Sequence, residues 1–182
     1  MKVLKKIIFI VVLVSISIGL LFVGSGYDMY KKAIEETSIE DKIAEIKSKE
    51  NYTKISELPQ MYKNAVISVE DHRFYKHNGI DIIAIGRAAF NDIKAMSFVE
   101  GGSTITQIAK NIYFTQEKKI ERKIAEVFMA FKIEKNCDKD EILELYLNTS
   151  YFGDGYDTPK EACKGYFNKE LNEMTDYECI LL

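Results

Sequence analysis

The sequence predicts a mainly α-helical domain behind an N-terminal membrane helix. Apolar residues recur at helical spacing, few segments alternate as strands do, and only two prolines interrupt the 182 residues. This length suits one well-packed domain with an appendage. The formal net charge of -3 argues against a general nucleic-acid binder, whose domain is usually strongly basic.

The first segment has the pattern of a membrane anchor. Lys2, Lys5 and Lys6 precede the uncharged run 7–24. As a helix this run reaches about 27 Å, close to the roughly 30 Å hydrocarbon core of a bilayer. Residues 1–26 are therefore expected to form a cytoplasmic tip and a single transmembrane helix, with the lysines inside and the rest exported. The alternative is a cleaved signal peptide, but the apolar run is longer than such peptides have and no clear cleavage site follows.

Helical periodicity continues after the anchor. We expect residues 27–54 to form a helical stem, with Ser38 and Asp41 as a capping pair. In the domain that follows, Ser103 and Asp138 are candidate caps, and helices are expected over 61–70, 80–93, 105–112, 117–135 and 140–151. The clearest of these has an apolar stripe along which it should pack, formed by Ile120, Ile124, Val127, Phe128 and Phe131.

Adjacent acids mark the end of the 61–70 helix. Glu70 and Asp71 are followed by Phe74 and His77, so a carboxylate lies beside aromatic residues and a tight turn. Such surroundings suit general acid or base work. The plainer interpretation is a solvated helix end, because isolated acids are rarely buried.

A second carboxylate and a set of cations lie further along the chain. Glu126 follows Arg122 by four residues, which predicts either an exposed ion pair or an acid in partly apolar surroundings. Near the start of the same helix, basic residues suited to a phosphate ligand gather, although a solvated face is the alternative: Lys110, Lys118, Lys119, Arg122 and Lys123.

The cysteines indicate no metal chemistry. Cys137, Cys163 and Cys179 form no CxxC arrangement, and only His72 and His77 are available to help them. Buried free thiols are expected, with a single disulfide as the alternative in an exported domain.

Four motifs occur in an order that resembles glycosyltransferase family 51. The first, EDHRFYKHNG at 70–79, matches EDxxFxxHxG. GGSTITQ at 101–107, followed by Lys110 and Asn111, resembles the second motif. RKIAE at 122–126 with Ala130 and Glu134 matches the third, and ILE, YLN and YFG between 142 and 153 match the fourth.

The resemblance implies a lysozyme-like, two-lobed helical domain over 55–182, with a cleft at the membrane surface, as in a monofunctional peptidoglycan transglycosylase. Such an enzyme polymerises lipid II into β-1,4-linked glycan with inversion and releases undecaprenyl pyrophosphate. No cofactor is obligatory, and a divalent cation, Mg or Mn, at the pyrophosphate is an option. The implied partners are lipid II, the growing glycan chain, the cytoplasmic membrane and cell-wall synthesis proteins, and no nucleic acid.

The resemblance also assigns roles by position. Glu70 matches the catalytic base and Glu126 the second essential glutamate, which either orients cations or holds a metal. Glu144, Tyr146 and Asn148 are expected to brace the cleft. Substrate contacts are expected from the remaining motif residues: Asp71, Phe74, His77, Ser103, Thr104, Gln107, Lys110, Asn111, Arg122 and Lys123.

Two departures from the family pattern leave alternatives open. Only two residues separate Gln107 from Lys110, one fewer than usual, so either a turn absorbs the difference or Lys110 points away from the donor. The sequence also stops at Leu182, within a helix expected to begin near Thr175. A truncated, non-catalytic relative that binds lipid-linked precursor or a partner protein is therefore the alternative function, and a lysozyme-like hydrolase is a third.

Overall fold

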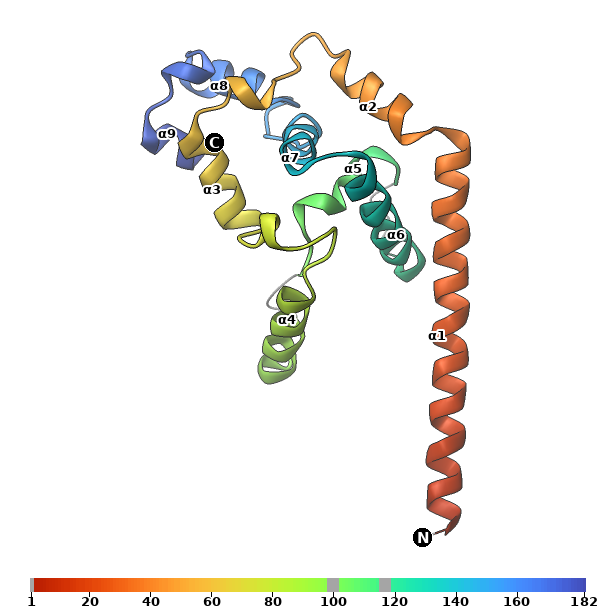
Figure 1. Ribbon diagram of the computed structural model, residues 1–182. Helices are drawn as coiled ribbons and strands as arrows, with labels where there is room; N and C mark the ends of the chain where they lie inside the picture. The colour runs from red at the N-terminus through yellow and green to blue at the C-terminus, as the bar shows by residue number, and fades with distance from the viewer. Residues whose placement is uncertain (1, 98–101, 115–118) are drawn as a thin grey trace.

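The computed structural model describes residues 2–97, 102–114 and 119–182, with only the backbone described at Gln107, Ala109 and Lys110. Within these ranges the chain forms helices and no β-strand, which confirms the mainly α class. Figure 1 shows one long helix, α1, leaving a cluster of shorter helices. The α-helices are α1 Lys2–Glu36, α2 Ile39–Lys47, α3 Gln60–Glu70, α4 Ile82–Ala95, α5 Ala109–Ile112, α6 Ile120–Asn136, α7 Lys139–Leu147, α8 Pro159–Phe167 and α9 Asp176–Leu181. The 3-10 turns are η1 Ile55–Glu57, η2 Phe74–Lys76, η3 Ile105–Ile108 and η4 Leu171–Glu173.

Helix α1 is long and apolar enough to cross a membrane, as its composition predicts. Its most apolar window has a mean hydropathy of 3.0 and none of that window is buried. The helix continues beyond the apolar run to Glu36, so the first part of the expected stem is the end of α1. A break then follows, and Ser38 starts α2 by accepting a hydrogen bond from the Asp41 amide at 3.1 Å. The predicted capping pair is confirmed.

Helix α7 lies at the centre of the domain. Its Ile142, Leu143, Leu145 and Leu147 side chains are at most 1% exposed. Asp138 caps the helix by accepting a 2.8 Å hydrogen bond from the Glu141 amide, as predicted. Around α7 the core gathers residues from the other helices and turns, including Tyr62, Phe74, Met129, Ile133 and Cys163.

The apolar stripe predicted for α6 is not the face that enters the core. Ile120 is 61% exposed and Phe131 is 40% exposed, so the expectation that the whole stripe packs was wrong. Ile124 and Phe128 instead contact α1, which lies beside α6. The helix has two apolar faces, because α1 covers one side and the core takes the other. The core face consists of Ala125, Glu126, Met129, Ala130 and Ile133.

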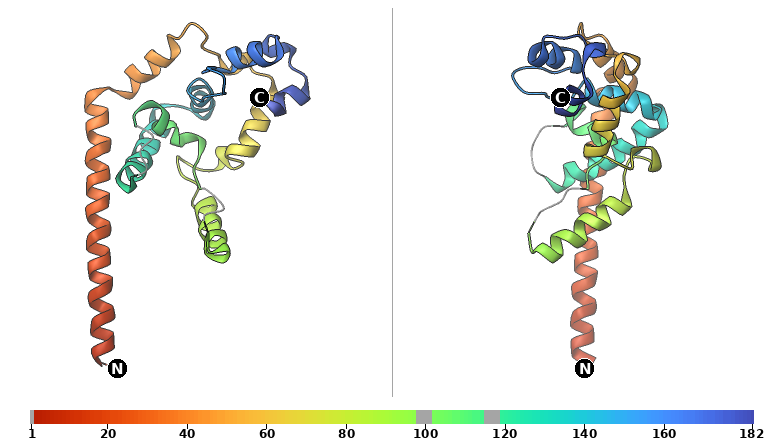
Figure 2. Two further views of the ribbon diagram at one scale, coloured as in Figure 1. Left: turned by 180° about the vertical axis from the view of Figure 1, so that it is seen from behind. Right: turned by 90° about the vertical axis from the view of Figure 1, so that its left-hand side faces the viewer.

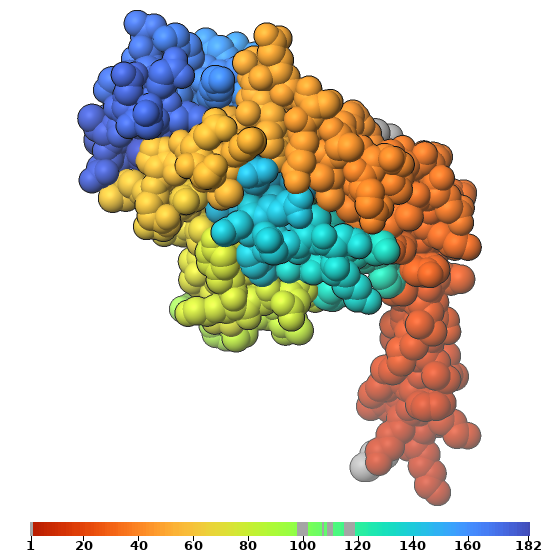
Figure 3. Space-filling model, turned by 45° about the horizontal axis from the view of Figure 1, so that its top comes forward, coloured from red at the N-terminus to blue at the C-terminus, as the bar shows by residue number. Residues whose placement is uncertain are grey.

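Helix α4 projects from the cluster on the side where α1 leaves it, as Figures 1, 2 and 3 show. It begins at Ile82 rather than Ile80 because the Asp81 carboxylate caps it, accepting from the amides of Ile83 and Ala84. Only Ala88 is buried in this helix. Its large apolar side chains are between 42% and 93% exposed when the following Met96 is included: Ile82, Ile83, Ile85, Phe90, Ile93 and Met96.

Candidate functional site

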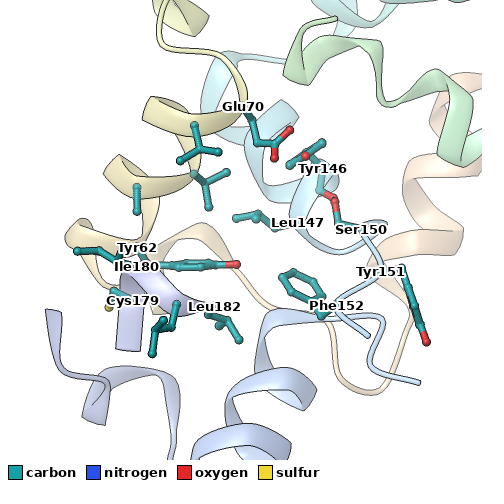
Figure 4. A pocket seen from close by; sticks show the side chains of 14 residues that line it. Tyr62, Glu70, Tyr146, Leu147, Ser150, Tyr151, Phe152, Cys179, Ile180 and Leu182 are labelled. Atoms are coloured by element: carbon teal, nitrogen blue, oxygen red, sulfur yellow. The ribbon is translucent and has the colours of Figure 1, made fainter. Parts of the chain in front are cut away.

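Glu70 ends α3 at the edge of a pocket of about 390 Å³. Its side chain is exposed, whereas most of the neighbouring lining is apolar (Figure 4). Helix α3 presents the carboxylate here because the helix stops at Asp71, whose backbone leaves the helical conformation. The lining comes from α3, α7, the loop after α7 and the C-terminal segment: Tyr62, Ala65, Val66, Val69, Glu70, Tyr146, Leu147, Ser150, Tyr151, Phe152, Cys179, Ile180, Leu181 and Leu182.

Tyr146 reaches the Glu70 carboxylate from α7 (Figure 4). Burial raises the pKa of Tyr146 to about 12, and the charge of Glu70 and a hydrogen bond to it act in the same direction. Ser150, one turn further on, donates to the Tyr146 carbonyl oxygen at 2.7 Å. The phenol therefore stays protonated at neutral pH and holds a carboxylate that is open to the pocket.

Asp71, Phe74 and His77 lie in the interior rather than in the pocket. The Asp71 carboxylate lies 2.8 Å from His77 Nε2 and accepts a 3.0 Å hydrogen bond from the amide of Ile105. Phe74 is fully buried, with the Lys139 ammonium 4.5 Å from its ring centroid. These contacts fix the turn that follows Glu70 against the second-motif segment.

The cations predicted on α6 surround a buried glutamate. Glu126 is 0% exposed, and its two carboxylate oxygens lie 2.7 Å from Arg122 Nη1 and 3.2 Å from Lys123 Nζ. Lys123 is about half exposed and also donates to the Ser103 hydroxyl at 2.9 Å. The predicted ion pair between Arg122 and Glu126 is therefore present, but it is not exposed as one interpretation expected, because the acid is buried on the core face of α6.

The second-motif residues are divided between interior and surface. Thr104 is buried and donates to the Gly79 carbonyl oxygen at 2.6 Å, whereas Ser103 and Asn111 are exposed. The side chains of Gln107 and Lys110 lie outside the described residues. The backbone here is a 3-10 turn followed by one α-helical turn, rather than one continuous α-helix.

Of the predicted residues, the structure thus places Glu70 at the pocket and gathers Arg122, Lys123 and Ser103 near Glu126. A family model described as transglycosylase matches residues 38–182. The chain belongs to the transglycosylase family. It is 48% identical over 129 residues to penicillin-binding protein 1F of Bacillus subtilis (strain 168). The aligned residues are 70% of this chain and 18% of that protein.

Other relatives match a similar length of the chain. Penicillin-binding protein 1A of Neisseria gonorrhoeae is 44% identical over 132 residues, covering 72% of this chain and 16% of that protein. The corresponding protein of Neisseria flavescens is 42% identical over the same length and with the same coverage. The chain therefore spans less than a fifth of the length of these curated relatives.

The Glu134 side chain connects the third motif of this transglycosylase domain to the first and second motifs. The sequence alone assigned it no role. One of its oxygens accepts from the Gly79 amide at 2.9 Å, from the Thr106 hydroxyl at 2.7 Å and from Lys139 at 2.7 Å. Gly79 adopts a φ of 89°, and a Cβ there would lie 3.2 Å from the Ala130 backbone. The available signal was the last acid of the third motif, eight residues after Glu126.

The fourth-motif residues do different things. Glu144 accepts hydrogen bonds from the Tyr52 hydroxyl and the Ile55 amide, and Asn148 exchanges two 2.8 Å hydrogen bonds with the Thr53 backbone. Both hold the segment that leads into α3. Tyr146 instead lies in the pocket with Glu70.

The described residues do not fit a metal held by Glu126. Both of its oxygens face cations, and no group of three or more His, Cys, Asp or Glu side chains that could hold a metal occurs in the described parts of the chain. The three cysteines are free and buried, as predicted.

Proposed function

We propose that this domain is a peptidoglycan glycosyltransferase that polymerises lipid II into β-1,4-linked glycan and releases undecaprenyl pyrophosphate. The observation that carries the proposal is the exposed Glu70 carboxylate at an open pocket, in a domain that also holds two cations on a fully buried glutamate. A proton acceptor and an anion-binding group are the two elements that this transfer requires.

Glu70 acts as the general base in this proposal. The acceptor lipid II presents its 4-hydroxyl, Glu70 removes the proton, and the oxygen attacks the anomeric carbon of the donor sugar as the bond to the pyrophosphate breaks. One displacement inverts the α-linked donor to a β-1,4 link, so no covalent enzyme intermediate forms. Tyr146 holds the carboxylate while it remains open to the pocket. Positioning and proton removal supply the catalysis.

Arg122 and Lys123, with Lys110 added from its motif position, stabilise the leaving pyrophosphate. Negative charge grows on the leaving oxygen as the bond breaks, so cations at that point bind the transition state more strongly than the substrate. Glu126 orients the two cations on α6 through its ion pairs. Ser103 orients Lys123, and Gln107 and Asn111 are proposed to contact substrate.

The remaining predicted residues are proposed to position the site. Phe74 is fully buried and Asp71, His77 and Thr104 are nearly so, and they join the turn after Glu70 to the segment before η3. If that turn moved, the Glu70 carboxylate and the cations Arg122 and Lys123 would no longer be placed to contact the same substrate.

The exposed face of α4 supports a cleft at the membrane. This helix carries large uncovered apolar side chains and projects on the side where α1 leaves the domain (Figure 3). Uncovered apolar patches of this kind mark interaction sites or membrane surfaces. A lipid-linked substrate would then reach the pocket from the bilayer.

Incubation of the chain with lipid II in vesicles, followed by product analysis, tests the proposal. We expect polymeric glycan and undecaprenyl pyrophosphate. Cleavage of preformed glycan without polymer formation would indicate a hydrolase. The absence of both activities in folded protein would refute the catalytic assignment and favour a binding role for the domain.

The topology provides a separate prediction. Lys2, Lys5 and Lys6 flank the apolar run on one side, so the domain should lie outside the cytoplasmic membrane. Protease added to intact spheroplasts should digest the domain. Full protection, with digestion after lysis, would contradict both the topology and the choice of substrate.

Tyr146→Phe should lower kcat about tenfold with little change in KM, because a hydrogen bond to a charged group contributes about 1.5 kcal/mol or more. The raised pKa keeps the Tyr146 phenol protonated. The contribution of its hydrogen bond to Glu70 is complete below the ordinary tyrosine pKa near 10 and is lost as the pH rises through about 12.

Tyr75→Phe is the matched control for this prediction. Tyr75 is 57% exposed, and its hydroxyl donates to Asp140 outside the pocket. An equal effect of both substitutions on rate and pH profile would show that Tyr146 has no special role at Glu70.

A further inference from the structure

Helix α1 continues past its apolar run and supports the domain through α6. The apolar run ends at Gly24, whereas α1 ends at Glu36. Figure 1 and the left view of Figure 2 show α6 beside this outer part of α1, and the two helices are in contact. The buried residue of α1 is Gly26, so the anchor and the domain are in direct contact just beyond the membrane-spanning part.

At Gly26 the two helices approach so closely that no side chain would fit between them. A Cβ at Gly26 would lie 2.6 Å from Ile124 Cγ2 and 2.9 Å from the Glu121 carbonyl oxygen. Real Cβ atoms essentially never approach so closely, and the carbonyl belongs to the α6 backbone, so α6 itself would have to move. A Cβ at Gly24 would have no heavy atom within 4 Å.

Aromatic side chains fix the rotation of α6 against α1. The Phe128 ring lies 5.2 Å from the Tyr27 ring in an edge arrangement, and 5.9 Å from the Tyr30 ring. Both distances are in the range of favourable aromatic pairs. Tyrosines just beyond an apolar span are also typical of the membrane interface.

The position of the contact along α1 sets its height above the bilayer. Each helical residue rises about 1.5 Å, so Gly26 lies about 3 Å beyond Gly24. The hydrocarbon core is about 30 Å thick and the whole bilayer about 40 to 45 Å, which leaves roughly 5 to 7 Å for each headgroup layer. The first turn of α6 therefore contacts α1 within the headgroup layer.

Arg122 and Lys123 lie between the two α6 residues that touch Gly26, namely Glu121 and Ile124. We propose that the Gly26 contact is a positioning device that holds these two cations at the level of the lipid phosphates, where the diphosphate of a membrane-bound, lipid-linked substrate lies. This inference rests on the proposed function. In this proposal α1 anchors the chain and also sets the height of Arg122 and Lys123 relative to the bilayer.

Gly26→Leu and Gly24→Leu form the test pair, because both replace a helical glycine with leucine and only the first meets α6. Each variant is assayed with lipid II in vesicles and with a short-chain, water-soluble lipid II analogue. We expect Gly26→Leu to lower turnover in vesicles about tenfold or more, since misplacement by about 1 Å can be costly. Turnover of the soluble analogue should change far less, and Gly24→Leu should behave as the parent. An equal loss on both substrates would mean a folding defect and would overturn the proposal.

A second measurement does not depend on activity. A fluorophore on Ile120→Cys, an exposed position in the first turn of α6, is quenched by lipids that carry a headgroup spin label; the native cysteines are buried. We expect strong quenching in the parent, a clear change with Gly26→Leu and none with Gly24→Leu, while a label at Lys135→Cys in the last turn is quenched little. Identical quenching in both glycine variants would refute the inference. The expected quenching pattern in a chain that makes no glycan would refute the proposed function alone.

Discussion

The Glu70→Gln variant is expected to make glycan from lipid II about 10² to 10⁴ times more slowly than the parent, which is the usual loss of rate when a general base is removed. The amide keeps the size of the side chain at the pocket edge but has no basic lone pair to accept the proton of the acceptor hydroxyl. Since Asp71 and the turn behind Glu70 are untouched, folding should not change. Initial rates of polymer formation measure the effect.

Binding should survive this substitution, which separates chemistry from recognition. The cations on α6 and the apolar pocket lining remain in place, so fluorescent lipid II should bind with nearly unchanged affinity. Glu57→Gln is the control, because Glu57 is an exposed acid on η1 outside the pocket. Glu70→Gln activity within a few-fold of the parent would show that another group removes the proton.

Local signals in the sequence were sufficient for much of the fold. Ser38 and Asp138 were recognisable as caps because the partner amide lies three residues along the same chain. Helix α7 was predictable because its apolar side chains all face one core. The helix expected near Thr175 is present as α9, which Thr175 caps.

Signals that depend on distant segments could not be assigned in this way. The periodicity of α6 showed an apolar stripe but could not say that α1 would cover it, since both a core and a neighbouring helix select apolar residues. Glu134 resembled a surface acid because its donors, Gly79, Thr106 and Lys139, come from three other elements. The spacing of Glu126 from Arg122 likewise left open whether the acid is exposed or lies in partly apolar surroundings.

The candidate site was predictable mainly through its motifs. Glu70, Glu126, Arg122 and Lys123 were chosen by motif position. The structure places Glu70 at the pocket and pairs Arg122 and Lys123 with Glu126. The contact of Tyr146 with Glu70 was not foreseen. A tyrosine on a core helix gives no sequence signal that its hydroxyl will meet a carboxylate from a segment more than seventy residues away.

The buried ion pair on α6 allows stability and activity to be separated. Among the described residues, Arg122→Leu leaves the fully buried Glu126 with the half-exposed Lys123 as its partner. Breaking one side of a buried pair usually costs about 3 to 5 kcal/mol, so this variant should unfold at much lower urea concentration. Lys31→Leu is the control, because it breaks an exposed i,i+4 pair with Glu35 and should cost about 0.5 kcal/mol or less.

The double variant Arg122→Leu/Glu126→Leu removes both charges and should recover most of the lost stability, since replacing a buried pair with apolar residues is often neutral or stabilising. It should nevertheless polymerise lipid II at least about 100-fold more slowly, because the cation that strengthens binding of the leaving pyrophosphate is gone. Urea unfolding in detergent followed by circular dichroism, together with the polymerisation rate, measures the two effects. If the double variant kept its activity, the proposed role of Arg122 and Glu126 in catalysis would be wrong. If it were as unstable as Arg122→Leu, the ion pair would be needed for the fold itself, and the loss of activity could not be assigned to the missing charges.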